Sequence, residues 1–447
     1  MKTGIILFCL LYCVAVSSTA LGSDIESRIR AMEETLKKQE ETIKEQQKII
    51  NELKEQIGTE MVAPIPEIDK KQPEVQKEAK ATGLFGGSFM TNPNISLVLN
   101  TYAYSSNLRN DEIRNRGIQG YTQEGIDRRN GFNLDAAELY IYAPVDPYFN
   151  LYATIPVKED GAELEEAYFV TTSLPVGHQI KGGKFKSGFG RLNSQHPHAW
   201  DFVDAPLPYR AFIGDEGINE KGVQYTYLLP LSFYTLFGVE ALQGENTPLF
   251  GADAANGIHA YSFFAKASLD VGDNATVLFG PSVIAGKTKT DTITTDSDFT
   301  GDSTLYGFEL TYKWKPSKNQ GFKLQSEYLY RSQSGDLTDI NLASVQRLKR
   351  CQDGLYIQGV YRWNQWDIGA RYDTISLFKD DYKLDGAKQD LGRRPWRATA
   401  MVDYNFSEFA LFRFQYNHDE SDVNGKINHE LFLQAVFSIG AHGAHQF

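Results

Sequence analysis

The sequence predicts an antiparallel transmembrane β-barrel of about sixteen strands, an all-β membrane fold, with an N-terminal α-helical coiled coil. Three observations predict it. Apolar and polar residues alternate with a period of two along the C-terminal half of the chain. Short turns alternate with long polar connections, and apolar residues recur at every seventh position near the N-terminus.

The alternation places charged side chains where a soluble protein would bury apolar ones. In one segment, Phe412 and Phe414 share a face, while Arg413 and Gln415 point to the other face. A soluble sandwich rarely carries charge after charge along one face of ten-residue strands. A barrel in lipid turns its apolar face outward and its charges inward to water. The pattern therefore favours a membrane barrel with a water-filled lumen.

Sixteen segments carry this pattern between the end of the linker and the C-terminus. They are residues 94–104, 132–143, 148–157, 163–173, 178–187, 220–229, 232–242, 258–270, 274–286, 303–315, 321–332, 354–364, 366–376, 396–406, 409–418 and 427–438. Short periplasmic turns and longer external loops, as at 105–131, 188–219, 287–302, 333–353 and 377–395, are typical of such barrels. An even strand number puts both termini in the periplasm. The terminal Phe447 is typical of barrels handed to the outer-membrane assembly machinery.

The composition indicates export to a Gram-negative outer membrane. Residues 1–22 have a charged start, a short apolar run and small residues at their end, which predicts a secretory signal peptide. No later segment reaches the ~20 apolar residues of a membrane helix. After that cleavage only Cys351 remains, so we expect no internal disulfide. The net charge of -12 and the lack of a basic patch argue against a nucleic-acid partner.

Three regions follow the signal peptide. Residues 23–59 form a heptad pattern with Ile29, Leu36, Ile43, Ile50 and Ile57 in one seam, which predicts a periplasmic coiled coil that associates with copies of itself. By analogy with other barrel porins we expect a homotrimer. Residues 60–82 are a linker rich in Pro, Lys and Glu, and residues 83–447 are the barrel, in contact with membrane lipid and lipopolysaccharide.

The connection at 188–219 is a candidate pore loop. It is long, rich in aromatic residues and proline, and acidic on balance. Its charged residues are Arg191, Asp201, Asp204, Arg210, Asp215 and Glu216. A long loop at this place in a sixteen-stranded barrel suggests a segment that folds into the pore and narrows it. The alternative is an external cap or a subunit contact.

Basic residues on the polar faces of the strands are the candidate pore wall. They are Lys184, Lys186, Arg331, Arg362, Arg371, Arg397 and Arg413. Facing an acidic loop, they would create a transverse field that orients polar solutes and filters them by size and charge. The alternative is that acids on the same strands, Asp367, Asp373, Asp403 and Glu327, pair with these cations.

His196 and His198 are the candidate metal ligands, with Asp201 and Asp204 nearby in the sequence. Imidazole and carboxylate groups suit zinc and other divalent metals. The alternative is that these histidines only form hydrogen bonds within the loop, so the sequence by itself predicts no cofactor. No nucleophile with a neighbouring base is evident, and an enzyme is not expected.

The loop motif from Phe189 to Gly217 resembles a proteobacterial porin-like family, as do Leu134 to Leu139 and the ending from Phe437 to Phe447. Members of that family are labelled zinc-regulated or TonB-dependent outer-membrane receptors. The chain is more distantly similar to phosphate-selective porins. The resemblance implies a barrel with a zinc contact at the His196 loop. However, residues 83–447 are too few for both a plug domain and roughly twenty-two strands.

The sequence thus predicts an outer-membrane porin that gives passive diffusion of small hydrophilic solutes or ions through a loop-constricted pore. Two alternatives remain: a receptor for metal uptake, and a structural barrel that anchors a periplasmic coiled-coil tether.

Overall fold

The computed structural model describes residues 93–121, 128–251, 257–294 and 297–440, together with Lys37 and Lys44. The chain divides into two compact units, Met1–Ala79 and Lys80–Phe447. Lys37 and Lys44 are helical and exposed. The rest of the first unit, with Ile29, Leu36, Ile43, Ile50 and Ile57, lies outside the described residues. The signal peptide, coiled coil and linker therefore stay predictions.

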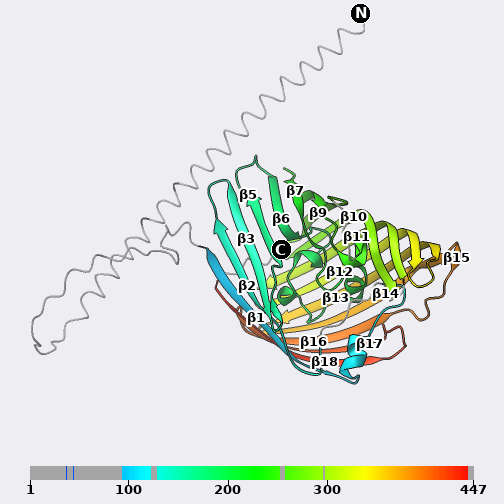
Figure 1. Ribbon diagram of the computed structural model, residues 1–447. Coiled ribbons are helices and arrows are strands. Elements are labelled where there is room, and N and C mark those ends of the chain that lie inside the picture. The colour runs from blue at the N-terminus through cyan, green and yellow to red at the C-terminus, as the bar shows by residue number, and fades with distance from the viewer. Residues whose placement is uncertain are drawn as a thin grey trace, which may run out of the picture. The chain divides into compact units, whose positions relative to one another are not determined.

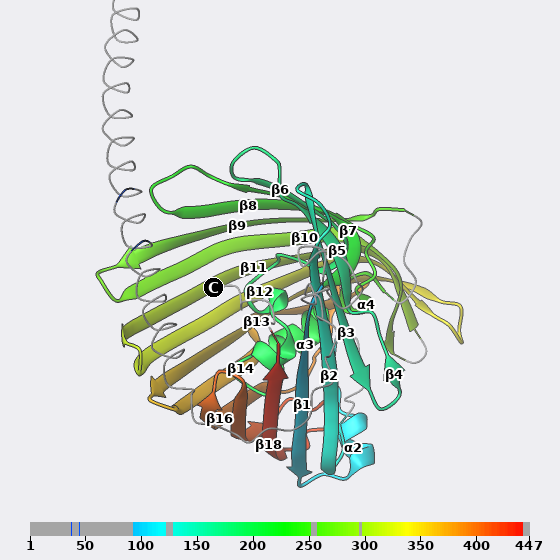
Figure 2. The same cartoon turned by 90° about the vertical axis from the view of Figure 1, so that its left-hand side faces the viewer.

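The second unit is a closed antiparallel barrel (Figure 1). Each long strand pairs with the next long strand in the chain, and β1 closes the ring by pairing with β18, where Leu99 lies opposite Phe437. β4 and β15 are only two residues long and extend neighbouring hairpins. The other sixteen strands form the barrel, so the predicted antiparallel barrel and its strand number are confirmed. Figure 2 shows the strands inclined around the barrel wall.

The strands and helices have the following bounds. The strands of the first half are β1 Asn94–Ser106, β2 Gly131–Pro144, β3 Phe149–Lys158, β4 Gly161–Ala162, β5 Glu166–Thr171, β6 His178–Lys186, β7 Asn219–Leu228, β8 Tyr234–Leu242 and β9 Ala260–Val271. Those of the second half are β10 Ala275–Thr294, β11 Ser297–Ser317, β12 Gln320–Asp339, β13 Val345–Trp363, β14 Trp366–Leu384, β15 Ala387–Lys388, β16 Trp396–Ser407, β17 Ala410–Asp419 and β18 Asn428–Ile439. The helical segments are α2 Asn110–Arg114, η2 Leu192–Ser194, η3 Pro197–Ala199, α3 Leu207–Ile213 and α4 Thr247–Phe250.

The barrel wall is apolar outside and charged inside. Ile368 is 55% exposed and Phe414 is 51% exposed, whereas the neighbouring Arg371 and Arg413 are 3% and 4% exposed. This distribution is the reverse of a soluble core and confirms the interpretation of the period-two pattern. Among the described residues, no helix has the length and apolar character needed to cross a membrane.

Three of the predicted long external loops are mostly strand. Residues 287–302, 333–353 and 377–395 continue β10 to β14 as paired ribbons, with Lys287 opposite Asp302 and Ser334 opposite Lys349. The prediction of long loops there was wrong because polar residues dominate these extensions, so the alternation fades while the backbone pairing goes on. The extensions share a small buried apolar cluster of Phe299, Leu337, Leu348 and Tyr382. The side chains of Lys287 and Asp302 are 78% and 75% exposed, as expected of a ribbon in water.

Candidate functional site in the barrel lumen

The segment between β6 and β7, residues 187–218, lies inside the barrel; we call it the inner loop. Its short helices are enclosed by the ring of strands (Figure 1). It leaves β6 and returns at β7, yet it bonds to strands across the ring. Asp204 pairs with Arg371 of β14 and Arg397 of β16, and the backbone N–H of Leu192 donates to Glu327 of β12 at 2.9 Å. The inner loop therefore crosses the lumen.

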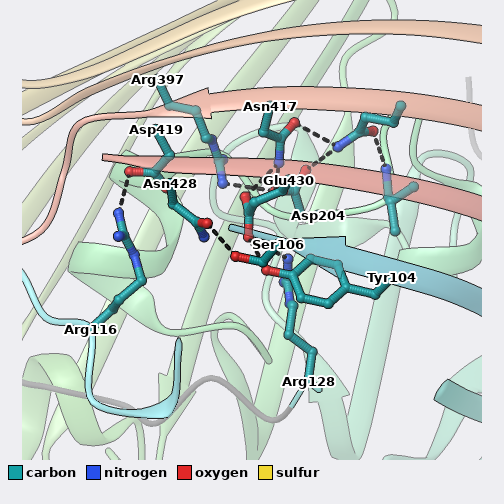
Figure 3. A network of polar contacts seen from close by, with 12 residues as sticks. Tyr104, Ser106, Arg116, Arg128, Asp204, Arg397, Asn417, Asp419, Asn428 and Glu430 are labelled. Atoms are coloured by element: carbon teal, nitrogen blue, oxygen red, sulfur yellow. Dashed lines mark hydrogen bonds and ion pairs between the residues drawn. The ribbon is translucent and has the colours of Figure 1, made fainter. Parts of the chain in front are cut away.

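Asp204 is the ionic anchor of the inner loop (Figure 3). Its carboxylate accepts from Arg397 at 2.7 Å, from Arg371 and Gln415 at 2.8 Å, and from Asn417 at 3.0 Å. Burial raises the pKa of Asp204, but Arg397 and Arg371 outweigh it and hold this pKa well below its usual range. Asp204 is therefore ionised wherever the protein is folded at ordinary pH.

The ionic network continues from Asp204 to the first long connection of the barrel. Asn417 also donates to Glu430 at 2.9 Å, and Glu430 accepts from the Tyr104 hydroxyl at 2.8 Å (Figure 3). Arg128 lies 3.7 Å from the same carboxylate, and Arg116 pairs with Asp419 at 2.8 Å. Both Arg128 and Arg116 belong to the connection between β1 and β2, so two loops share one buried network.

Glu327 fixes the start of the inner loop. It accepts from the backbone N–H groups of Arg191 and Leu192 at 2.9 Å, from Tyr209 at 3.0 Å and from Tyr356 at 2.6 Å. Gly190 has φ +62°, and a Cβ at this position would collide with the Glu327 carboxylate. The glycine before Arg191 therefore lets the loop backbone come close to the buried Glu327 carboxylate.

An apolar cluster holds the rest of the inner loop. Leu207, Tyr209 and Phe212 of the loop pack with Phe185 of β6 and Tyr356 of β13, all of them buried. The sequence placed Phe185 on the face opposite Lys184 and Lys186, but it is buried against the loop, because α3 supplies an apolar surface inside the barrel. Ionic and apolar contacts therefore both keep the loop in the lumen.

A cavity of about 870 Å³ remains between the inner loop and the wall formed by β1, β2, β3 and β6. Among the described residues that line it are ten acids and five bases. The acids are Asp135, Glu138, Glu159, Asp160, Glu163, Glu165, Asp204, Asp215, Glu216 and Glu245, and the bases are Arg114, Arg128, Arg129, Lys158 and Lys186. The cavity therefore has an acidic lining.

His196 lies next to the lining residues Pro197 and His198, among three carboxylates. Its Nε2 lies 2.9 Å from Glu166, and its Nδ1 lies 3.3 Å from Glu165 and 3.6 Å from Glu138. Burial lowers the pKa of His196, but the adjacent carboxylates of Glu165 and Glu166 raise it to about 10. Glu138, Glu165 and His196 each present one oxygen or nitrogen atom, and these three atoms lie within 4.8 Å of one another. This group has the donor types of a metal site.

The other predicted loop residues have separate partners. Asp201 pairs with Lys323 and accepts from Gln358 at 2.8 Å. Arg210 lies 3.7 Å from Asp215. Glu216 lines the cavity, and its backbone oxygen accepts from Lys186 at 3.2 Å. Arg191 is buried at the start of η2.

The predicted pore-wall cations are largely paired. Arg362 pairs with Asp367 at 2.6 Å and Arg413 pairs with Asp403 at 2.8 Å. Asp373 forms ion pairs with both Arg371 and Arg397. The alternative of mutual pairing is confirmed for these three acids. It was wrong for Glu327, whose carboxylate accepts from the loop backbone and two tyrosines because the loop start occupies that part of the lumen.

Arg331, Lys186 and Lys184 have three different surroundings. Arg331 is buried over the rings of Tyr121 and Phe212, at 4.7 and 5.3 Å. Lys186 lines the cavity and pairs with Glu165 at 2.8 Å. Lys184 donates to the backbone oxygen of Leu164 at 2.9 Å, in an exposed bond.

Sequence reasoning did not single out Glu165, Glu166 or Lys323 as partners of the loop. Glu138 lies inside the motif from Leu134 to Leu139, but the motif did not indicate a role for this acid. Its place on the polar face of a strand was the only available signal, and it did not identify a partner.

Comparison with known proteins places the chain in a family. It is 40% identical over 381 residues to an uncharacterized protein of Aquifex aeolicus (strain VF5), which covers 79% of this chain and 80% of that protein. The chain belongs to the same family as this Aquifex protein. No protein-family model matches the chain.

Similar solved structures are outer-membrane proteins. The channel DcaP of Acinetobacter baumannii aligns with a TM-score of 0.49 at 13% identity, over 78% of this chain and 97% of that one. The anion-selective porin of Comamonas acidovorans aligns with a TM-score of 0.47 at 9% identity, over 78% of this chain and 100% of that one. OmpT of Vibrio cholerae in its trimer form aligns with a TM-score of 0.46 at 12% identity, over 78% of this chain and 99% of that one.

Proposed function

We propose that this protein is an outer-membrane porin that gives passive diffusion of small hydrophilic solutes or ions. One observation carries the proposal: a closed barrel with an apolar outer face holds a polar cavity of about 870 Å³ beside an inner loop. That volume is within the ~300–1,000 Å³ typical of small-molecule sites, so it has room for a hydrated ion or a small solute.

The outer membrane of a Gram-negative bacterium is the proposed location. In lipid, every backbone polar group must be satisfied within the protein, and a closed barrel does so without exposing a strand edge. The exposed apolar residues of the wall, such as Ile368 and Phe414, suit lipid contact. The periplasmic coiled coil and the homotrimer belong to the same proposal. The coiled coil rests on the heptads from Ile29 to Ile57, and the number of three subunits rests on analogy with other barrel porins.

We propose that the inner loop narrows the pore and that the pore favours cations over anions. Buried acids form ion pairs with Arg371, Arg397 and Arg413. The cavity lining, by contrast, includes Asp215 and Glu216. The lining holds ten acids against five bases among the described residues. Clefts lined by one sign of charge concentrate ions of the opposite sign.

A planar lipid bilayer tests the proposal. The purified protein should conduct with an ohmic current and no energy source, and a salt gradient should give a reversal potential of the sign for cation preference. An absence of conductance, with the protein folded, would refute a porin. An anion-selective current would leave the porin but refute the role of the acidic lining.

The second candidate is a receptor for metal uptake, and the cluster of His196 with Glu138 and Glu165 favours it. This candidate requires uptake that stops when the inner-membrane energising complex is removed. A porin requires uptake that goes on without the complex, so a transport assay in cells separates the two.

A further inference from the structure

We infer that Glu138, Glu165 and His196 form a binding site for a divalent transition-metal ion at the wall of the lumen cavity. The three ligands come from β2, from the segment before β5 and from the inner loop. Glu138 and Glu165 both line the cavity, so an ion can reach them from the water there. This inference is independent of the proposed channel activity.

The distances around His196 Nδ1 fit a shared ion better than direct hydrogen bonds. Nδ1 lies 3.3 Å from Glu165 Oε2 and 3.6 Å from Glu138 Oε2. Both distances exceed the ~2.7–3.2 Å of an N–H···O bond, and this buried nitrogen has no hydrogen-bond partner among the described residues. A tetrahedral zinc site with bonds of about 2.0–2.1 Å has ligand-to-ligand edges of about 3.3–3.5 Å.

Glu166 fixes the orientation that such a site needs. Its Oε2 lies 2.9 Å from His196 Nε2, so Nε2 carries a hydrogen and donates it, and Nδ1 is left to face the other two acids. When an ion displaces the proton on Nδ1, the Nδ1 lone pair and one oxygen of each of the two carboxylates are the groups that would hold it. A carboxylate that holds the distal imidazole nitrogen is the usual arrangement around histidine ligands.

Lys186 completes the surroundings without occupying the metal position. Its Nζ pairs with Glu165 Oε1 at 2.8 Å, and its backbone N–H donates to Glu166 Oε1 at 2.7 Å. The oxygens facing His196 are thus the opposite ones, Oε2 of each acid. Once the ion has displaced the proton on His196 Nδ1, three carboxylates and one ammonium leave a formal charge of about -2, which one divalent ion balances.

The ligand set differs from the pair of histidines predicted from the sequence. His198 stacks on His196 with ring centroids 5.8 Å apart, and its Nδ1 lies 3.3 Å from Glu138. His198 is therefore a neighbour of the site that orients Glu138. One nitrogen with carboxylate oxygens suits Zn²⁺ or Co²⁺, while Ca²⁺ and Mg²⁺ prefer oxygen ligands alone.

Equilibrium dialysis of the full chain in detergent, after treatment with a chelator, tests this site with Zn²⁺ as the probe. One ion should bind per chain at micromolar Zn²⁺, and excess Mg²⁺ should not displace it. Co²⁺ should give the strong visible absorption of a tetrahedral site. Glu138→Gln and His196→Gln should each weaken binding at least tenfold, and Glu166→Gln should weaken it about 10–100-fold while the Co²⁺ spectrum is retained.

Two controls distinguish this site from other imidazoles and from misfolding. His418→Gln removes a histidine that pairs with Glu420 elsewhere, and the combination of His442→Gln with His445→Gln removes those near the C-terminus; binding should be unchanged in both. Every variant should keep the wild-type melting temperature without metal to within a few degrees. No bound Zn²⁺, or equal binding by the Glu138, Glu166 and His196 variants, overturns the inference.

Discussion

Asp204→Asn should release the inner loop from the barrel wall. Asp204 is 5% exposed and compensates Arg371 and Arg397, which are themselves 3% and 2% exposed. After the substitution, Asp373 is the carboxylate among the described residues that still forms an ion pair with both guanidinium groups. Removing one partner of a buried ion pair costs about 3–5 kcal/mol. With a factor of ten for every ~1.4 kcal/mol, the population of the open loop should rise roughly a hundred- to a few-thousand-fold.

Limited trypsin digestion measures this opening, because the inner loop contains Arg191 and Arg210 as cleavage sites. When opening and closing are fast, the cleavage rate follows the open population. The digestion rate at these two arginines should increase by the factor given above, with the fragments identified by mass spectrometry. Single-channel currents should become larger and noisier.

The matched control is an acid in an exposed ion pair. Asp336 lies 3.1 Å from Arg347, with side chains 59% and 64% exposed, so Asp336→Asn should change stability by no more than about 1 kcal/mol. Equal digestion rates for wild type, Asp204→Asn and Asp336→Asn would refute the anchor role of Asp204. The apolar cluster and Glu327 would then be sufficient to hold the loop.

Three further predictions concern pH, selectivity and assembly. The pKa of Asp204 is lower in the folded protein than in the unfolded chain. The stabilisation by Asp204 is therefore complete above the unfolded pKa of ~3.9 and is lost as the pH falls through the folded pKa. Channels at pH 4 should show no loop opening, and opening at pH 5 would contradict this. Asp215→Asn with Glu216→Gln should shift the reversal potential towards anions, most clearly at 0.1 M salt, where the Debye length is ~10 Å; an unchanged potential would exclude these acids from the ion path. Ile43→Asp with Ile50→Asp should weaken the oligomer in native electrophoresis, because charge would enter the predicted seam, whereas an unchanged oligomer would limit the coil to tethering.

The barrel could be predicted because its signal is local. Lipid on one side and water on the other impose a period of two on each membrane strand, and Ile368 and Arg371 obey it without knowledge of any neighbour. The rule weakens beyond the membrane, where neither face of a strand contacts lipid. Lys287 and Asp302 therefore looked like loop residues, although they lie opposite each other in β10 and β11.

The site was only partly predictable because its contacts join distant parts of the chain. The position and length of the inner loop suggested a segment inside the barrel that carries several acids. Their partners depend on which strand lies across the lumen. His196 meets Glu138 and Glu165 from two other segments, and no spacing in the sequence records that meeting.

The pairing of the arginines determines which charges remain to act on a solute. A sequence with Arg371, Arg397 and Arg413 on inward faces predicts a basic wall, but each of these cations is already bound to a buried acid. Their role is to hold the inner loop and the wall together, since a paired buried charge contributes little field at a distance. Acids outnumber bases among the residues that line the cavity, so we expect a negative field in the open part of the lumen. A cation that enters should therefore travel along the β1 to β6 side of the barrel, past Glu138 and His196, and away from the side where the loop is anchored.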